Sequence, residues 1–187
     1  MQNPAECAFY IPARLADRLR CAFNLIVALD SPGPAIFRQE RLGLNGKPFM
    51  IYKFRTMRLD AEANGPRWAA VCDTRCTRFG QFLRHTRLDE LPQLWNILRG
   101  DMSLVGPRPE RAYFYREFET YIPGFSNRMM VTPGLTGWAQ VNGYRGDTSI
   151  TKRIEHDLYY IENWTLGWDF KILFLTFFKG FINKNAY

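Results

Sequence analysis

Two adjacent carboxylates, Asp89 and Glu90, are the residues of this 187-residue chain best placed to do chemistry. They lie within residues 84–110 (RHTRLDELPQLWNILRGDMSLVGPRPE), a segment that also contains Arg84 and Arg108. Carboxylates beside guanidinium groups suit phosphoryl transfer, because a metal ion and fixed cations can neutralise the charge of the transferred group. We therefore place the candidate active site in this segment.

A helix is predicted directly after the two carboxylates. Apolar residues recur there at helical spacing, as Leu91, Leu94, Trp95 and Leu98. Pro92 is acceptable only in the first turn and Gly100 is a natural stop, so the prediction is an amphipathic helix over Leu91–Arg99. Asp89 and Glu90 then lie at or just before its N-terminus, where backbone N–H groups and the helix dipole stabilise anions.

Asp89 also has a simpler interpretation, since aspartate is a favoured N-cap residue. Two observations favour a functional role instead. Glu90 doubles the negative charge at the same helix end, which a cap does not require. Four arginines, more than one cap needs, are close in the sequence: Arg84, Arg87, Arg99 and Arg108. Spacing alone leaves both interpretations open.

Arg108 lies between two prolines, Pro107 and Pro109. Proline fixes its own φ and favours an extended residue before it, so the arginine is expected on a stiff loop. Such a loop lowers the entropy cost of binding an anion. The alternative is a rigid turn that exposes an arginine to solvent.

Two more cations are expected on a β-hairpin upstream. Residues 35–42 and 48–57 flank a turn-rich Gly-Leu-Asn-Gly segment. Alternation along the second strand places Lys53 and Arg55 on one face together with Phe49 and Ile51. The two cations are either a solvated strand end or a pair that faces a phosphate.

Helical spacing also predicts a helix over Thr77–Thr86. Arg84 and Arg87, three residues apart, would share one face if this helix continued that far. Downstream, Thr136–Val141 is predicted to be a short extended piece or a tight loop.

Two helical segments are predicted near the C-terminus. The first, Thr151–Trp164, has Arg153 and Asp157 four residues apart, which predicts a solvated ion pair. The second, Asp169–Ile182, is apolar nearly all round. It is either buried against the domain or lies in a membrane interface, where aromatic and lysine side chains anchor well.

Composition narrows the choice of partners. A net charge of +7 suits an anionic partner, whether nucleic acid, an acidic membrane surface or a phosphorylated substrate. The four cysteines and two histidines show no zinc-binding spacing. No apolar run reaches the roughly 18 residues typical of a spanning helix. The apolar Ala22–Leu29 segment is either core or membrane-associated.

Several motifs resemble those of one family and occur in the same order. They are DSPGP (30–34), KFRTM (53–57), RFG (78–80), LDELPQ (88–93), GDMS (100–103), VGPRP (105–109) and PGLTGW (133–138). The chain resembles the bacterial sugar transferases, the monotopic phosphoglycosyl transferases, from about residue 22 to its end.

The resemblance implies a two-step transfer. Asp89 would attack the β-phosphate of a UDP-sugar to give a phosphosugar aspartyl ester and UMP, and a polyprenyl (undecaprenyl) phosphate would then accept the phosphosugar. A magnesium ion would bind on the Asp89 and Glu90 side. Glu90 would position the metal or accept a proton.

The resemblance also assigns roles to the cations and to one further carboxylate. Phosphate oxygens would be held by Lys53, Arg55, Arg84 and Arg108. Asp157 would orient an active-site arginine.

We expect an α+β fold: a mostly helical single domain with a small β-hairpin, membrane-surface amphipathic helices and a shortened N-terminal re-entrant helix. Residues 1–21 are interpreted as a divergent N-terminal segment and residues 22–187 as the catalytic domain. The expected location is the cytoplasmic face of the bacterial inner membrane, where the enzyme would initiate surface polysaccharide synthesis.

Two alternative functions are considered. A family member with a truncated anchor could be catalytically silent. A basic, aromatic-rich chain could instead bind nucleic acid, but that function explains neither the Asp89-Glu90 pair nor the proline-flanked Arg108. We therefore expect no nucleic-acid partner.

Overall fold

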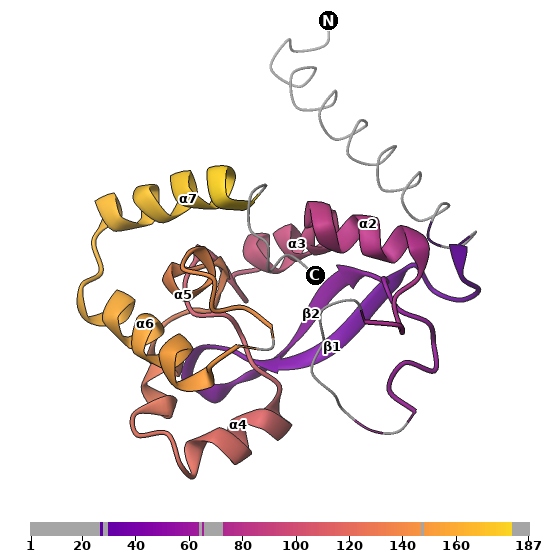
Figure 1. Ribbon diagram of the computed structural model, residues 1–187. Helices are drawn as coiled ribbons and strands as arrows, with labels where there is room; N and C mark the ends of the chain where they lie inside the picture. The colour runs from indigo at the N-terminus through magenta and orange to yellow at the C-terminus, as the bar shows by residue number, and fades with distance from the viewer. Residues whose placement is uncertain (1–26, 28–29, 64, 66–72, 147, 181–187) are drawn as a thin grey trace, which may run out of the picture.

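The computed structural model describes residues 27, 30–63, 65, 73–146 and 148–180 (Figure 1). Their elements are β1 (Ile36–Leu42), η1 (Leu44–Gly46), β2 (Pro48–Phe54), α2 (Arg78–Thr86), η2 (Leu88–Glu90), α3 (Gln93–Leu98), β3 (Ser103–Val105), α4 (Ala112–Glu119), η3 (Phe125–Met130), β4 (Gly134–Thr136), α5 (Trp138–Val141), α6 (Ile150–Glu162) and α7 (Leu166–Gly180). The predicted α+β class with a small hairpin is confirmed. The predicted re-entrant segment, Ala22–Leu29, lies outside the described residues except for Val27.

Strands β1 and β2 form the predicted hairpin. They are antiparallel, with Ile36 opposite Phe54 and Leu42 opposite Pro48. The connection includes Asn45 in a left-handed conformation (φ 55°), which asparagine tolerates better than most residues. This register fixes where the cations of the second strand lie.

Helix α2 begins as predicted because Thr77 caps it. The Thr77 Oγ1 accepts a hydrogen bond from the N–H of Gly80 at 3.0 Å. Gly80 lies so close to the Thr56 backbone that a Cβ there would be 2.7 Å from the Thr56 Cα. The helix ends before Arg87, whose φ is 59°. It therefore does not continue far enough for Arg84 and Arg87 to share a helix face.

Helix α3 follows η2, which contains both carboxylates, and it turns its apolar face outward. Gln93 and Asn96 are 0% exposed. Asn96 accepts a hydrogen bond from the Tyr52 N–H at 3.2 Å and donates one to the Met50 carbonyl at 2.7 Å, so it attaches the helix to β2. The apolar residues are between 43% and 80% exposed: Leu91, Leu94, Trp95 and Leu98. The predicted helix is confirmed, with an interior face that is polar.

Strands β3 and β4 form a parallel pair in which Ser103 lies opposite Gly134. The chain then turns at Gly137, which packs on the backbone of Gly106; a Cβ at Gly137 would be 3.1 Å from the Gly106 carbonyl carbon. Helix α5 begins immediately afterwards. The prediction of an extended piece or loop over Thr136–Val141 is therefore wrong from Trp138 onward.

Two apolar clusters pack the helices of the C-terminal half. One joins α4, η3 and α6 through Phe114, Phe118, Phe125 and Ile154. The other joins β3, α5, α6 and α7 through Val105, Val141, Tyr160 and Ile172. The helix predicted over Thr151–Trp164 is confirmed as α6, and α7 contributes only part of its apolar surface to the core.

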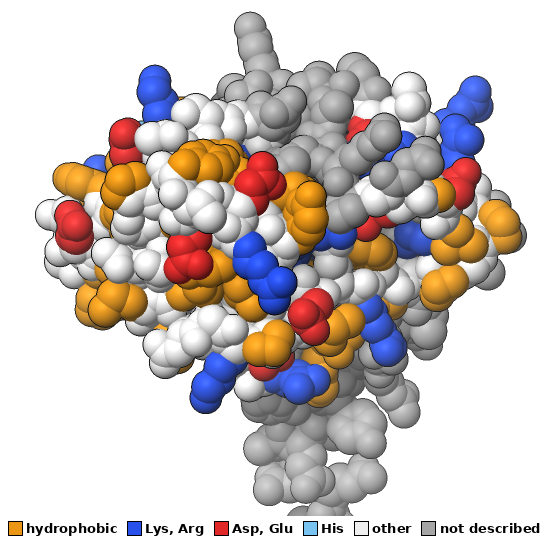
Figure 2. Space-filling model, turned by 90° about the horizontal axis from the view of Figure 1, so that it is seen from below, with side chains coloured by type: hydrophobic (Ala, Val, Ile, Leu, Met, Phe, Trp, Pro, Cys, Tyr) orange, Lys and Arg blue, Asp and Glu red, His pale blue; other side chains and the backbone are white. Residues whose placement is uncertain are grey.

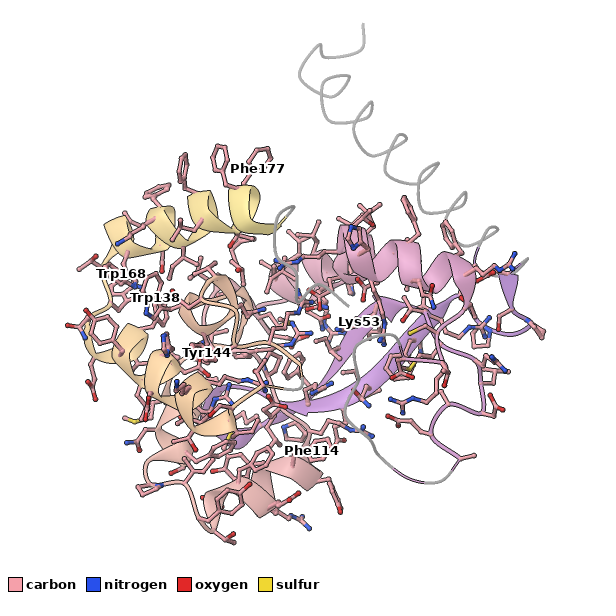
Figure 3. All side chains as sticks on the ribbon, in the orientation of Figure 1. Lys53, Phe114, Trp138, Tyr144, Trp168 and Phe177 are labelled. Carbon is pink, nitrogen blue, oxygen red and sulfur yellow. The ribbon has the colours of Figure 1, made fainter. Side chains whose placement is uncertain are left out.

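The outer side of α7 is apolar and exposed. Figure 1 shows α2, α3 and α7 along its upper edge, and in Figure 3 Phe177 points away from the fold. The exposed residues of α7 are Leu166, Phe170, Phe174, Phe177 and Phe178. The opposite face, in Figure 2, has acidic and basic side chains among its hydrophobic ones. Helix α7 is thus buried on one side and exposed on the other.

Among the described residues, no helix is long and apolar enough to cross a membrane.

Candidate active site

A pocket of about 450 Å³ reaches Asp89. Its walls come from the hairpin, the turn after β2, α2, η2, α4, α6 and the loops before α2, α4 and α6. Charged side chains that line it are Arg41, Lys53, Arg55, Arg58, Glu62, Arg75, Arg84, Asp89, Arg108, Glu110, Arg111, Arg145 and Arg153. Cations far outnumber carboxylates, which suits an anionic ligand of moderate size.

Glu90 fixes three of the cations around one oxygen. Its Oε1 accepts hydrogen bonds from the Lys53 Nζ at 2.8 Å and the Arg108 Nη2 at 2.7 Å, and it lies 2.9 Å from the Arg145 Nη2. Burial alone would raise the pKa of Glu90, but Arg108, Arg145 and Lys53 outweigh it and hold the pKa well below its usual range. Glu90 is therefore ionised at neutral pH.

Asp89 is the neighbouring carboxylate, and its surroundings differ. Its residue is 6% exposed, yet it lines the pocket. Within the described part of the chain, no hydrogen bond or ion pair engages its carboxylate. Burial and, after it, the charge of Glu90 raise the pKa of Asp89. A desolvated carboxylate of this kind in a cleft is typical of a functional site.

Lys53 lies on β2, below α2 in Figure 3, and lines the same pocket. Burial lowers the pKa of its ammonium group from 10.5 to about 8, although the charge of Glu90 acts in the opposite direction. The lysine therefore changes charge within an accessible range of pH.

Arg55 and Arg84 are both held by groups beside the pocket. The Arg55 Nη2 donates a hydrogen bond to the Ser31 carbonyl, while its Nη1 is buried with no partner among the described residues. The Arg84 Nε donates to the Thr56 Oγ1 at 2.8 Å. Because a buried donor without an acceptor is costly, the Arg55 Nη1 suits an anionic ligand.

Asp157 does not line the pocket. Its Oδ2 accepts a hydrogen bond from the Arg128 Nη2 at 2.6 Å, and the same nitrogen donates to the Arg108 carbonyl at 2.9 Å. Asp157 thus holds Arg128, and Arg128 in turn holds the backbone of Arg108, which lines the pocket.

The prediction of a solvated Arg153–Asp157 ion pair is wrong. Both side chains are buried, because this face of α6 is turned inward. The Arg153 Nη1 donates instead to the Glu110 Oε1 at 3.1 Å, and its Nη2 donates to the Gly146 carbonyl at 2.5 Å.

Arg145 is a site residue that the sequence reasoning missed. It lines the pocket and contacts Glu90, although it lies 55 positions farther along the chain. It lies in a turn-rich segment without periodicity, so its only sequence signal is an arginine between glycines, at Gly143 and Gly146.

Among the described residues, no group of three or more His, Cys, Asp or Glu side chains is arranged to hold a metal ion. Asp89 fits a magnesium ion, since Mg²⁺ is usually held by one or two carboxylates together with substrate phosphates. Glu90 fits less well, because three cations already surround its Oε1.

The sequence of the chain matches a known family. A family model described as bacterial sugar transferase matches residues 11–183. The chain is 49% identical over 171 residues to the UDP-glucose:undecaprenyl-phosphate glucose-1-phosphate transferase of Escherichia coli strain K12, covering 89% of this chain and 37% of that protein.

Of two further relatives, one has the same name and the other names a different sugar. A protein of the same name from Xanthomonas campestris pv. campestris is 47% identical over 174 residues, or 90% of this chain and 36% of the relative. The UDP-N-acetylgalactosamine-undecaprenyl-phosphate N-acetylgalactosaminephosphotransferase of Aeromonas hydrophila is 46% identical over 171 residues, or 90% and 40%. The chain thus spans between 36% and 40% of the length of these three relatives.

Proposed function

Because this chain belongs to the bacterial sugar transferase family, we propose that it transfers a sugar 1-phosphate from a UDP-sugar to a polyprenyl phosphate. The donor and acceptor classes are those in the names of its relatives, which differ from one another in the sugar. The family model matches residues 11–183 of this chain. The proposal therefore specifies the reaction and leaves the sugar open.

The observation that carries the proposal is the contrast between the two adjacent carboxylates. Glu90 is surrounded by three cations, whereas Asp89 is buried, lines the pocket and has no partner in the described chain. A carboxylate oxygen that a protein leaves unengaged in a basic pocket is suited to nucleophilic attack on phosphorus. This contrast supports Asp89 as the attacking group and Glu90 as the group that positions the cations.

The reaction then has two displacements at the same phosphorus. A carboxylate oxygen of Asp89 bonds to the β-phosphorus of the donor, and the bond from that phosphorus to the bridging oxygen breaks, so UMP leaves. A phosphate oxygen of the polyprenyl phosphate next attacks the β-phosphorus and releases the Asp89 carboxylate. Each step exchanges one phosphorus–oxygen bond for another, and the covalent phosphosugar links them.

The cations would stabilise the charge of the donor and of each transition state. Lys53, Arg55, Arg84 and Arg108 line the pocket, and Arg55 has a buried donor to offer. Fixed cations act without reorganising during the reaction, which makes them effective in phosphoryl transfer. A magnesium ion, when bound, would reduce the repulsion between the carboxylate and the diphosphate. Asp89 is the residue best suited to hold it.

We place the chain at the cytoplasmic face of the inner membrane, with its exposed apolar helices against lipid. Support comes from the exposed side chains of α3 and α7, among them Trp95, Leu98, Phe174 and Phe177. Aromatic and aliphatic residues on one face are typical of helices that lie in a membrane interface. An acceptor with a hydrocarbon tail would then be presented beside the pocket.

The test is a labelling experiment without lipid. The purified chain is incubated with magnesium and with UDP-glucose or UDP-N-acetylgalactosamine labelled in the sugar. We expect label on the protein that hydroxylamine removes, together with release of UMP. The matched control is Asp89→Asn, which should give neither.

A folded parent chain that gives no label and no UMP from these donors, even after polyprenyl phosphate and liposomes are added, would overturn the proposal. A catalytically silent family member would then be the better description. Equal labelling of the parent and the Asp89→Asn variant would instead refute the assignment of the nucleophile.

A further inference from the structure

The pocket follows β1 from the position opposite Lys53 toward the turn of the hairpin. Phe37, Gln39 and Arg41 line it and alternate with outward-facing residues, so they share one face of the strand. Phe37 lies opposite Lys53 in the hairpin, whereas Arg41 is four residues farther along, roughly 13 Å at the rise of an antiparallel strand. We call the part of the pocket lined by these three β1 residues the outer end.

The orientation of the Gln39 amide is fixed by its neighbour. The Arg41 Nη2 donates a hydrogen bond to the Gln39 Oε1 at 2.7 Å. An arginine offers only donors, so the amide must turn its oxygen to Arg41. Its Nε2, which has no partner among the described residues, is left to donate elsewhere.

Arg41 is itself held in place. Its Nη1 donates to the Pro109 carbonyl at 3.2 Å and lies 3.7 Å from the Glu110 Oε2. Glu110, the nearest carboxylate, also accepts a hydrogen bond from Arg153. The hydrogen-bond acceptors at the outer end are therefore engaged by the protein, and the groups left for a ligand are hydrogen-bond donors.

A ligand that presents a hydrogen-bond acceptor to the Gln39 Nε2 would suit this environment. The ring of Phe37, 37% exposed, adds an apolar wall against which a planar ring could lie. A pyrimidine fits when a carbonyl oxygen occupies the position that faces this donor, because the carbonyl accepts and cannot donate. Together with the apolar wall, this favours a base over a sugar, which has no planar ring to lie against Phe37.

We propose that the outer end binds the base of the nucleoside diphosphate donor, and that Gln39 selects a base with a carbonyl oxygen over one with an amino group in the same place. This inference rests on the proposed function, which puts the reacting phosphate at Asp89. The nucleoside then extends from there along β1. Uracil presents O4 to the Gln39 amide, whereas cytosine would set its N4 amino group against that donor.

The test measures product binding and needs no turnover. Calorimetry with UMP and CMP gives the ratio of the two dissociation constants for the parent chain and for Gln39→Glu. We expect the parent to bind UMP roughly tenfold more tightly than CMP. UMP gains the hydrogen bond from the Gln39 amide to O4, whereas CMP places an amino donor against the same amide donor. In Gln39→Glu the ratio should fall to about one or reverse, since a carboxylate accepts where the amide donates.

Two controls isolate the effect on the base. The added charge of Gln39→Glu repels both nucleotides equally, so it weakens both affinities and leaves their ratio to report the base. Gln39→Met, which has a similar length and no donor, should lose the preference without the repulsion. Glu40→Gln alters the next residue of the strand, which is exposed and does not line the pocket, and should leave the ratio unchanged.

Several outcomes would overturn the inference. They are a parent chain that does not bind UMP, a parent ratio near one, or a ratio that Gln39→Glu leaves unchanged. A Gln39→Glu variant that changes the preference between UDP-glucose and UDP-N-acetylgalactosamine, and not between UMP and CMP, would place the sugar at the outer end. Selective UMP binding without turnover would keep the inference and refute the proposed activity.

Discussion

Replacing each of the adjacent carboxylates by its amide should change stability in opposite directions. Glu90→Gln removes the charge that Lys53, Arg108 and Arg145 surround at 2.7–2.9 Å. A hydrogen bond to a charged group contributes about 1.5–3 kcal/mol and a neutral one about 0.5–1.5, so each of three contacts loses about 1 kcal/mol or more. The three cations are partly exposed and can regain water, so we expect a loss of about 3 kcal/mol.

Asp89→Asn should do the reverse. Burial and the charge of Glu90 raise the pKa of Asp89, which means that ionised Asp89 destabilises the folded chain. The amide removes this charge at constant shape, so the free energy of unfolding should increase. Activity should nevertheless be abolished, because the proposed nucleophile is gone.

Urea unfolding at neutral pH, with thermal melts in parallel, measures both effects. For a chain of this size the Glu90→Gln loss corresponds to a decrease in Tm of roughly 6–12 °C. Both differences should shrink as the pH falls. The stabilisation from Glu90 is lost as the pH drops through its depressed folded-state pKa, and Asp89 becomes protonated in both states. A Glu90→Gln variant as stable as the parent, or an Asp89→Asn variant that is equally destabilised, would refute this reasoning.

Three further predictions test other parts of the structure. The kcat/KM for the donor should fall as the pH rises through about 8, because Lys53 loses its charge there. Lys53→Arg should move this fall to higher pH. If the fall stays at the same pH in the variant, another group causes it. Asn96→Ala should lower the free energy of unfolding by about 2–4 kcal/mol in urea, because two backbone groups of β2 lose their partner; a loss below 1 kcal/mol would mean that water replaces it. Gly80→Ala should cost about 1–3 kcal/mol, since a Cβ cannot fit against the Thr56 backbone, and a neutral result in the same assay would show that α2 can shift.

Local spacing predicted α3 but not its orientation. The leucines and the tryptophan predict a helix, and Pro92 with Gly100 bound it closely. The same apolar stripe would suit a protein core, however, and only the partners of the opposite face decide between the two. Those partners are backbone groups of β2, which Asn96 contacts across 44 and 46 positions of the chain.

The site was predictable where strand or helix periodicity positions a side chain. Alternation placed Lys53 and Arg55 on one face, and both line the pocket. The choice of ion-pair partners depends on packing between distant segments, so Arg153 contacts Glu110 and not the carboxylate one turn away on its own helix. Parallel pairing of β3 with β4 was missed for a similar reason, since strands of three residues are too short to show a period.

The outward apolar face of α3 has a consequence for the size of the acceptor. A helix is about 10 Å thick, so a bilayer against Leu94 and Leu98 would be separated from the pocket by little more than one helix. A headgroup phosphate is shorter than that distance, so the first carbons of the tail would have to leave the lipid for the phosphate to reach Asp89. Tail length would then govern how long an acceptor resides in the membrane, while the chemical step depends on its phosphate and the carbons next to it.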